Sequence, residues 1–294
     1  MPAHGSRADT TTRPRIIALI NQKGGVGKTT TTVNLGAAMA ALGKKVLVVD
    51  LDPQAHASLH LGVDPAASVR TVYDLLLDWD DEAGASIVKI NLNLSVVPSE
   101  TDLAAAESEL ATAADRHRRL KNILERIGGK FDCILIDCPP SLGILTLNAL
   151  AAAREVIIPM QAHFLALQGV GKLMETVQLV ATKLNPGLSV AGVVLCMHDG
   201  SATLTHEVVA DIEAYFEQAR GQNVPWSGAQ VFKPPIRRNI KLAECPSFGK
   251  SIFDYAPTAP GAADYKALAE AILGGATAAK SPAACCAASL LATR

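Results

Sequence analysis

A glycine-rich loop with two lysines constrains the fold of this chain more than any other segment. It comprises Lys23, Gly24, Gly25, Val26, Gly27, Lys28, Thr29 and Thr30. An apolar run at 16–20 precedes the loop and a helical pattern follows it, which is the setting of a phosphate-binding loop. Glycines let backbone N–H groups converge on an anion, and the helix adds the positive end of its dipole. The segment therefore predicts a nucleotide-binding fold, with all eight residues at the nucleotide.

The polar side chains of this loop have distinct expected roles. Lys28 can reach the β- and γ-phosphates, and the Thr29 hydroxyl can ligate Mg²⁺. The general motif has a glycine five residues before Gly27, whereas this chain has Gln22 there and an additional lysine, Lys23. One nucleotide does not need this second positive charge. The surplus indicates that Lys23 serves a different phosphate chain.

Strand and helix patterns alternate along the chain, which predicts an α/β fold with a doubly wound, mainly parallel sheet flanked by helices. Aromatic residues make up only 4% of the 294 residues, as expected when helices cover both faces of a sheet. Expected strands are 15–21, 45–51, 92–98, 131–137, 155–160 and 188–197. Expected helices are 28–42, 115–127, 167–184, one from a Thr205 cap to about Arg220, and 264–273, with 221–236 irregular. We expect one domain over 14–273, a disordered leader over 1–13 and a disordered tail over 274–294.

Composition excludes several classes of function. The net charge is −1, so any nucleic-acid binding must come from a local patch. No uninterrupted run of 18 apolar residues occurs, which argues against a membrane span, and residues 1–13 lack the apolar core of a signal peptide. Cys133, Cys138 and Cys196 lie in apolar runs, which favours buried thiols in a reducing cytoplasm over a metal or iron–sulfur role for the first two. Cys285 and Cys286 are interpreted as incidental thiols, with lipidation as the alternative.

Acidic residues end two of the expected strands. Asp137 ends the strand 131–137, so its carboxylate is expected near the metal, where it can hold Mg²⁺ through water. Asp50 and Asp52 follow the apolar run of the strand 45–51. We expect Asp52 to position or activate the attacking water and Asp50 to lie nearer the metal. The alternative is that Asp50 and Asp52 only cap local backbone.

These motifs together resemble one known family. The loop, the segment 48–54 (VVDLDPQ) and the segment 136–141 (IDCPPS) are similar to the ParA/MinD family of deviant Walker A ATPases. The similarity continues through 145–150, 157–160, 242–250 and 256–261, so it covers about 14–273. Within the family, the chain most resembles the ParA (Soj-like) ATPases that partition chromosomes and plasmids.

The resemblance implies a P-loop NTPase fold, the cofactors ATP and Mg²⁺, and a slow ATPase stimulated by a ParB-like adaptor protein. It gives Lys23 the role of the signature lysine that crosses a dimer interface to the partner's nucleotide, and so implies an ATP-sandwich homodimer. Lys23, Lys28 and Asp52 are then the catalytic residues, with Thr29, Asp137 and Asp50 around the metal. The segment 138–150 resembles a switch that senses the γ-phosphate. The family also implies a cytoplasmic, nucleoid-associated protein.

Relatives of this branch bind DNA without sequence preference through basic residues. Here the expected cluster comprises Lys233, Arg237, Arg238, Lys241 and Lys250, which stand within 18 residues and are opposed in that stretch only by Glu244. Such a cluster suits phosphate contacts. The alternative is a solvated, positively biased loop. A second basic run (Arg116, Arg118, Arg119 and Lys121) is interpreted as a solvated helix face. Ser201 stands where Soj-like relatives commonly carry a DNA-contacting arginine.

Two other functions remain open from the sequence. A MinD-like ATPase would bind membrane through a basic amphipathic C-terminal helix, but 283–294 carries one arginine and no Phe or Trp, so we expect no membrane partner. A relative that positions a protein cargo would share every motif described above.

Overall fold

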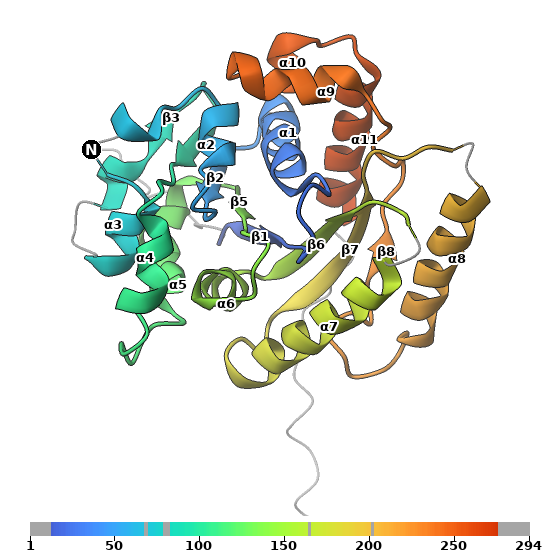
Figure 1. Ribbon diagram of the computed structural model, residues 1–294, viewed down its shortest axis with the longest axis horizontal. Coiled ribbons are helices and arrows are strands. Elements are labelled where there is room, and N and C mark those ends of the chain that lie inside the picture. Colours follow the sequence, from blue (N-terminus) through green and yellow to red (C-terminus); the bar gives the residue numbers. More distant parts are fainter. Residues whose placement is uncertain (1–12, 68–69, 79–82, 164–165, 201–202, 276–294) are drawn as a thin grey trace, which may run out of the picture.

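A central sheet organises the protein (Figure 1). The computed structural model describes residues 13–67, 70–78, 83–163, 166–200 and 203–275. Within this part the sheet has eight strands in the order β3-β4-β2-β5-β1-β6-β7-β8. Their bounds are β1 Arg15–Leu19, β2 Val46–Asp50, β3 Val88–Lys89, β4 Leu94–Val97, β5 Cys133–Asp137, β6 Glu155–Met160, β7 Ser189–Leu195 and β8 Gln230–Val231. Only β3 pairs antiparallel among these strands, so the predicted mainly parallel α/β sheet is confirmed.

Helices cover both faces of the sheet (Figure 1). One face packs against α1 (Lys28–Ala41), α2 (His56–His60), α9 (Ile240–Glu244), α10 (Ile252–Tyr255) and α11 (Pro260–Gly275). The other packs against α3 (Val72–Leu77), α4 (Leu103–Glu109), α5 (Arg119–Ile127), α6 (Ile144–Ala152), α7 (Ala166–Lys183) and α8 (Thr203–Gln218). Short 3-10 turns are η1 (Pro65–Ala67), η2 (Ala83–Ser86), η3 (Gly128–Lys130) and η4 (Cys245–Phe248). None of the described helices is long and apolar enough to cross a membrane.

The strand sequences explain this two-sided burial. All five residues of β2 and of β5 are buried. Successive side chains of a strand point to opposite faces, so Ile17 and Leu19 join the core under α1 while Ala18 joins the core under α6 and α7. Gly36 lets α1 lie close to the sheet, since a Cβ there would be 3.2 Å from Val48 Cγ2. The phosphate loop is thereby placed at the centre of the sheet, directly after β1.

Several expected boundaries are wrong. Helix α8 begins at Thr203, so Thr205 lies inside its first turn and does not cap it. The stretch expected to be irregular contains β8, which pairs with β7 where Gly192 faces Gln230. Gly192 has φ +154°, and a Cβ there would clash with the Gln230 carbonyl, so this close pairing requires glycine. Helix α11 is longer than expected at both ends. The rest of the expected leader and tail, residues 1–12 and 276–294, lies outside the described residues.

Candidate nucleotide site

The loop between β1 and α1 has the conformation that its glycines predict. Gly25 and Gly27 have φ values of +70° and +93°, in the left-handed region that favours glycine. Gly27 is the N-cap of the 14-residue helix α1, and no side chain caps the first turn. The N–H groups that begin α1 are thus free of side-chain acceptors, and an anion can satisfy them.

Lys28 lies inside this loop. Only 7% of its surface is exposed, and its Nζ donates a hydrogen bond to the carbonyl oxygen of Lys23 at 3.2 Å. Burial lowers the pKa of Lys28, while the nearby carboxylates of Asp137 and Asp52 oppose that shift. The Lys28 amine thus lies inside the loop, in contact with the loop backbone.

Two threonine hydroxyls converge on Asp137 at the end of β5. Thr29 Oγ1 donates to Asp137 Oδ2 at 2.7 Å, and Thr32 Oγ1 donates to Asp137 Oδ1 at 2.8 Å. Sequence reasoning missed Thr32, although its position three residues after Thr29 places it on the same face of α1. The described residues contain no cluster of three His, Cys, Asp or Glu side chains that could hold a metal. Thr29 and Asp137 are nevertheless the oxygen donors that suit Mg²⁺, which keeps waters and phosphate oxygens as its other ligands.

Asp50 lies beside Asp137 because β2 and β5 pair in register at these two residues. Both carboxyl groups are fully buried. Burial raises the pKa of Asp137 to about 7, with the neighbouring Asp50 as the next cause, and burial raises the pKa of Asp50 to about 6. A cation at this edge would favour the ionised forms of both groups, so their electrostatics also fit a divalent metal.

Asp50 and Asp52 have different hydrogen-bond partners in the structure. Asp50 Oδ2 accepts hydrogen bonds from the backbone N–H of Ser58 at 2.8 Å and from its hydroxyl at 2.7 Å, so it anchors α2. Asp52 is 8% exposed, and within the described residues only Oδ1 accepts a hydrogen bond, from the Gln54 N–H. Asp50 also accepts from the Asp52 N–H, so the local backbone contacts of the alternative interpretation are present for both. Within the described residues, the second carboxylate oxygen of Asp52 therefore accepts no hydrogen bond, and its carboxylate lies near enough to Lys28 to affect the pKa of that lysine.

A cavity of about 420 Å³ extends from the loop toward α9 and α11. Gly27 and Thr30 of the loop and of α1 are among its lining residues, and its lining surface is mainly apolar. The remaining wall comes from Cys196, Met197, Ile236, Arg237, Arg238, Asn239, Ile240, Leu242, Ala243 and Tyr265. Sequence reasoning missed this cavity, because its walls come from three distant segments that only the fold assembles. Its place beside the phosphate loop and its apolar lining suit a nucleotide base.

The basic cluster is less free than its sequence indicates. Lys233 pairs with Glu213 on α8 at 3.1 Å, and Lys241 pairs with Glu244 at 2.8 Å. Arg237 donates to both oxygens of Asp264 on α11, with a closest distance of 2.7 Å. Glu244 is the one acid within 233–250, but Glu213 and Asp264 from other elements also pair with members of the cluster.

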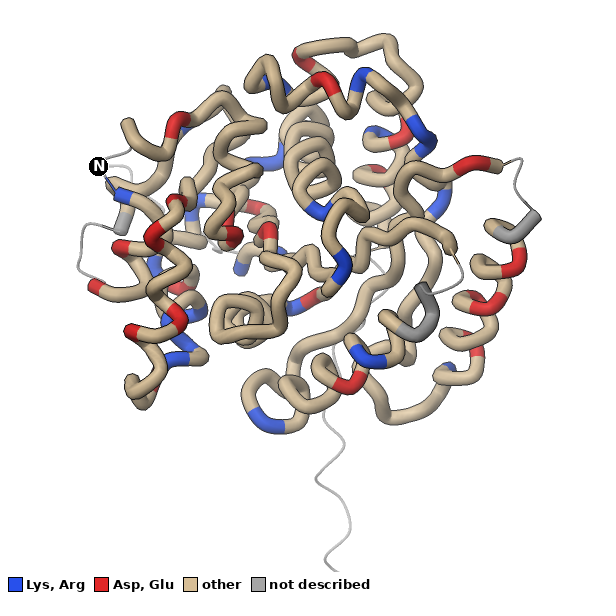
Figure 2. Tube along the Cα trace, in the orientation of Figure 1, with Lys and Arg blue, Asp and Glu red and all other residues tan. Residues whose placement is uncertain are grey.

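Arg238 and Lys250 differ from the other three members of the cluster. Both are exposed, and neither forms an ion pair within the described part of the chain. Acidic residues are distributed along α8 (Figure 2), and one of them, Glu213, pairs with Lys233 of the cluster. The available positive charge is thus on the α9 and η4 side. Ser201, the position of the missing arginine, lies outside the described residues.

Comparison with known proteins agrees with this geometry. The AAA domain family matches residues 14–190. The sporulation initiation inhibitor protein Soj of Bacillus subtilis is 45% identical over 260 residues, which cover 88% of this chain and 98% of Soj. The chromosome partitioning protein ParA of Myxococcus xanthus is 42% identical, with 88% of each chain covered. This chain belongs to the Soj/ParA family.

A solved structure supports the Soj/ParA assignment at the level of the fold. Cobyrinic acid a,c-diamide synthase from Mycobacterium smegmatis, crystallised with an ATP analogue and magnesium, has 36% sequence identity and a TM-score of 0.74. The match covers 91% of this chain and 97% of that one. The family and the P-loop fold predicted from the motifs are both confirmed.

Proposed function

We propose that this protein is an ATP-hydrolysing switch that partitions a chromosome or plasmid. Membership of the Soj/ParA family of partitioning ATPases supports the biological process. The observation that carries the proposal is the separation of the two loop lysines: Lys28 is buried inside the loop, whereas Lys23 is exposed on its outer side. One lysine serves the protomer's own nucleotide, and the other is available to a second protomer.

In the proposed site the backbone and side chains of 23–30 surround the phosphates, and the base occupies the 420 Å³ cavity. Thr29 and Asp137 hold Mg²⁺, with Asp50 behind them. The metal would neutralise negative charge on the β- and γ-phosphates. Asp52 orients the attacking water through its free oxygen. The ATP analogue and magnesium in the Mycobacterium smegmatis protein support these cofactors.

The proposed cycle couples ATP to dimerisation and DNA binding. Two protomers enclose two nucleotides, and Lys23 of each crosses to the partner's phosphates. Dimerisation doubles the DNA-binding surface, so the ATP state controls DNA binding through avidity. Arg238 and Lys250 make the main phosphate contacts, whereas Lys233, Arg237 and Lys241 contribute less because acids already neutralise them.

The protein hydrolyses ATP slowly on its own, and a ParB-like adaptor accelerates hydrolysis. The residence time of the dimer on DNA then sets the length of the cycle. The protein is then cytoplasmic and associated with the nucleoid. Two other functions fit the same nucleotide site: membrane-associated positioning, as in MinD, and positioning of a protein cargo.

Sedimentation with nucleotide distinguishes these functions. With ATP and Mg²⁺ the protein should sediment as a dimer and pellet with long, non-specific DNA, and with ADP it should remain a monomer in the supernatant. ATP-dependent pelleting with anionic liposomes in place of DNA would contradict the proposal and favour the MinD-like function. Binding to neither would favour a protein cargo.

A further inference from the structure

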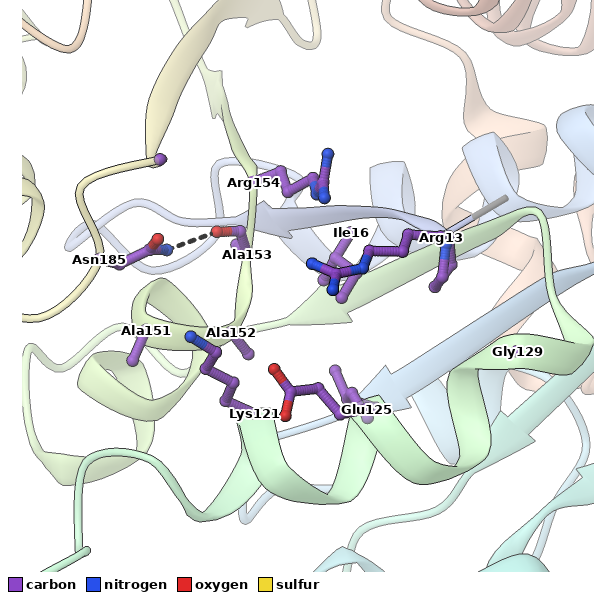
Figure 3. A pocket seen from close by; sticks show the side chains of 13 residues that line it. Arg13, Ile16, Lys121, Glu125, Gly129, Ala151, Ala152, Ala153, Arg154 and Asn185 are labelled. Carbon is purple, nitrogen blue, oxygen red and sulfur yellow. Dashed lines mark hydrogen bonds between the residues drawn. The ribbon is translucent and has the colours of Figure 1, made fainter. Parts of the chain in front are cut away.

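A cavity in the described part of the chain lies far from the phosphate loop. It measures about 710 Å³ and is lined by Pro14 and Ile16 at the start of β1 and by Arg154 just before β6 (Figure 3). The phosphate loop follows the opposite end of β1, so the two sites lie at opposite edges of the sheet. Neither the proposed nucleotide site nor the basic cluster includes any residue of this cavity.

Positive charge gathers around this cavity. Arg13, Lys121 and Arg154 line it, together with a single acid, Glu125. Lys121 and Glu125 project from α5, while Arg13 and Arg154 lie on the facing wall (Figure 3). Within the described part of the chain, none of the three cations forms an ion pair or a side-chain hydrogen bond. Like charges around a concave surface focus a positive potential that attracts anions.

The three cations are not engaged with the C-terminal carbonyl groups of the neighbouring helix α6. Positive side chains often stabilise the last carbonyls of a helix, and α6 ends at this cavity. Here the Asn185 side-chain amide performs that role, since Nδ2 donates to the carbonyl oxygen of Leu150 at 2.9 Å. It also donates to the carbonyl oxygen of Ala153 at 2.6 Å, the hydrogen bond drawn in Figure 3. Lys121 and Arg154 are therefore available to a ligand.

The floor of the cavity is apolar. Leu124 and Ala152 are almost fully buried and Ile16 is half-buried, and all three line the cavity. An apolar floor below a cationic rim suits a molecule with an apolar body and a negatively charged head. We propose that this cavity binds a small organic anion, with its phosphate, sulfonate or carboxylate head among Arg13, Lys121 and Arg154 and its body on this floor.

A pair of matched fluorescent probes tests this site. The probe 8-anilinonaphthalene-1-sulfonate has an apolar body with a sulfonate, and N-phenyl-1-naphthylamine has the same body without the charge. Titrations use the full-length protein saturated with ADP and Mg²⁺, so that the phosphate loop is filled. The sulfonate should bind saturably and at least about tenfold more tightly than the uncharged probe, because only it gains the Coulomb attraction of the cations.

Charge variants then locate the binding. Arg154→Glu and Lys121→Glu should each weaken sulfonate binding by about tenfold, whereas Arg154→Lys should retain it. Lys266→Glu, at an exposed position of α11 that does not line the cavity, is the matched control and should leave binding unchanged. The proposal would be overturned if Arg154→Glu and Lys121→Glu bound the sulfonate with parental affinity. Equal affinity of the parent for the charged and uncharged probes would also overturn it.

Discussion

The ammonium of Lys23 lies 2.6 Å from Nε2 of His163. A lysine ammonium only donates hydrogen bonds, so the imidazole nitrogen is the acceptor in this contact. His163 follows β6, whereas the ammonium of Lys28 donates a hydrogen bond to the main chain of Lys23. In the single chain, Lys23 is thus held by its own protomer, and the proposed dimer must exchange this contact for the partner's phosphates.

Alanine substitutions should separate the two lysines of the loop. Lys28→Ala should weaken ATP binding by about 10- to 100-fold, because a charge-assisted hydrogen bond to phosphate is removed. Lys23→Ala should leave ATP binding by the monomer within about threefold of the parent, because the other loop residues still bind the protomer's own nucleotide. The same variant should abolish the ATP-dependent dimer, because it removes the contact with the partner's phosphates. Nucleotide titration and sedimentation velocity measure the two effects. An ATP-dependent dimer of Lys23→Ala at parental strength would refute the role across the interface.

Asp52→Ala should slow ATP hydrolysis by about 100-fold while ATP and Mg²⁺ stay bound, because only the orientation of the water depends on its free oxygen. The variant should accumulate as a dimer on DNA. Turnover and DNA sedimentation in the same preparation measure this combination. Unchanged turnover would shift the role to Asp50 or Asp137.

Asp50→Ala should act differently from Asp52→Ala. It removes the acceptor of the Ser58 N–H and hydroxyl, so it should lower the free energy of unfolding by about 1–3 kcal/mol. Denaturant unfolding of both variants checks the contrast, since Asp52→Ala should unfold like the parent. Equal loss of stability in the two variants would contradict the separate roles assigned here.

Local motifs made the centre of this site predictable from sequence. A strand, a glycine-rich loop and a helix place Lys28 and Thr29 by themselves, and parallel strands bring their carboxyl ends, with Asp50 and Asp137, to one edge. The partners of these residues were not predictable. Arg237 meets Asp264 across 27 residues of chain, and nothing near either residue in the sequence indicates the pair.

The 420 Å³ cavity beside the phosphate loop was also not predictable from the sequence. In the sequence, the apolar residues that line it cannot be told from ordinary core residues, because burial against a ligand and burial against protein give the same hydrophobic pattern. The 236–242 segment also carries lysine and arginine, a composition that is typical of a nucleic-acid-binding surface.

DNA binding should depend on the unpaired members of the basic cluster. Arg238→Glu and Lys250→Glu should each weaken ATP-dependent DNA binding by at least about tenfold, since each reversal occurs twice in the symmetric dimer. Lys233→Glu and Lys241→Glu should have smaller effects. Lys183→Glu, at the end of α7, is the exposed control and should bind like the parent.

The salt dependence gives this prediction a second measurement. The slope of log affinity against log salt concentration should flatten by about one unit for each DNA phosphate that the variant no longer neutralises. Parental DNA binding by both Arg238→Glu and Lys250→Glu, with an unchanged slope, would exclude this surface as the DNA site.

His60 should make the protein less stable in mild acid. Its side chain is 1% exposed on α2, and burial lowers its pKa from 6.5 to about 4, with the main chain of Lys250 partly opposing the shift. Between these two pH values the unfolded chain binds a proton that the folded protein does not. The free energy of unfolding therefore falls as pH drops from 7 to 4, by up to about 3 kcal/mol from this residue.

Two variants isolate this effect from the buried aspartates, whose raised pKa values act in the opposite direction over the same range. His60→Phe should remove the loss at low pH, so that its free energy of unfolding relative to the parent rises as pH falls. His56→Phe, at an exposed position of the same helix, should follow the parent curve. Urea unfolding at pH 7, 6 and 5 measures all three proteins. Parallel curves for His60→Phe and the parent would show that His60 is protonated in the folded protein as readily as in the unfolded chain, because only a difference in proton binding between the two states changes the slope.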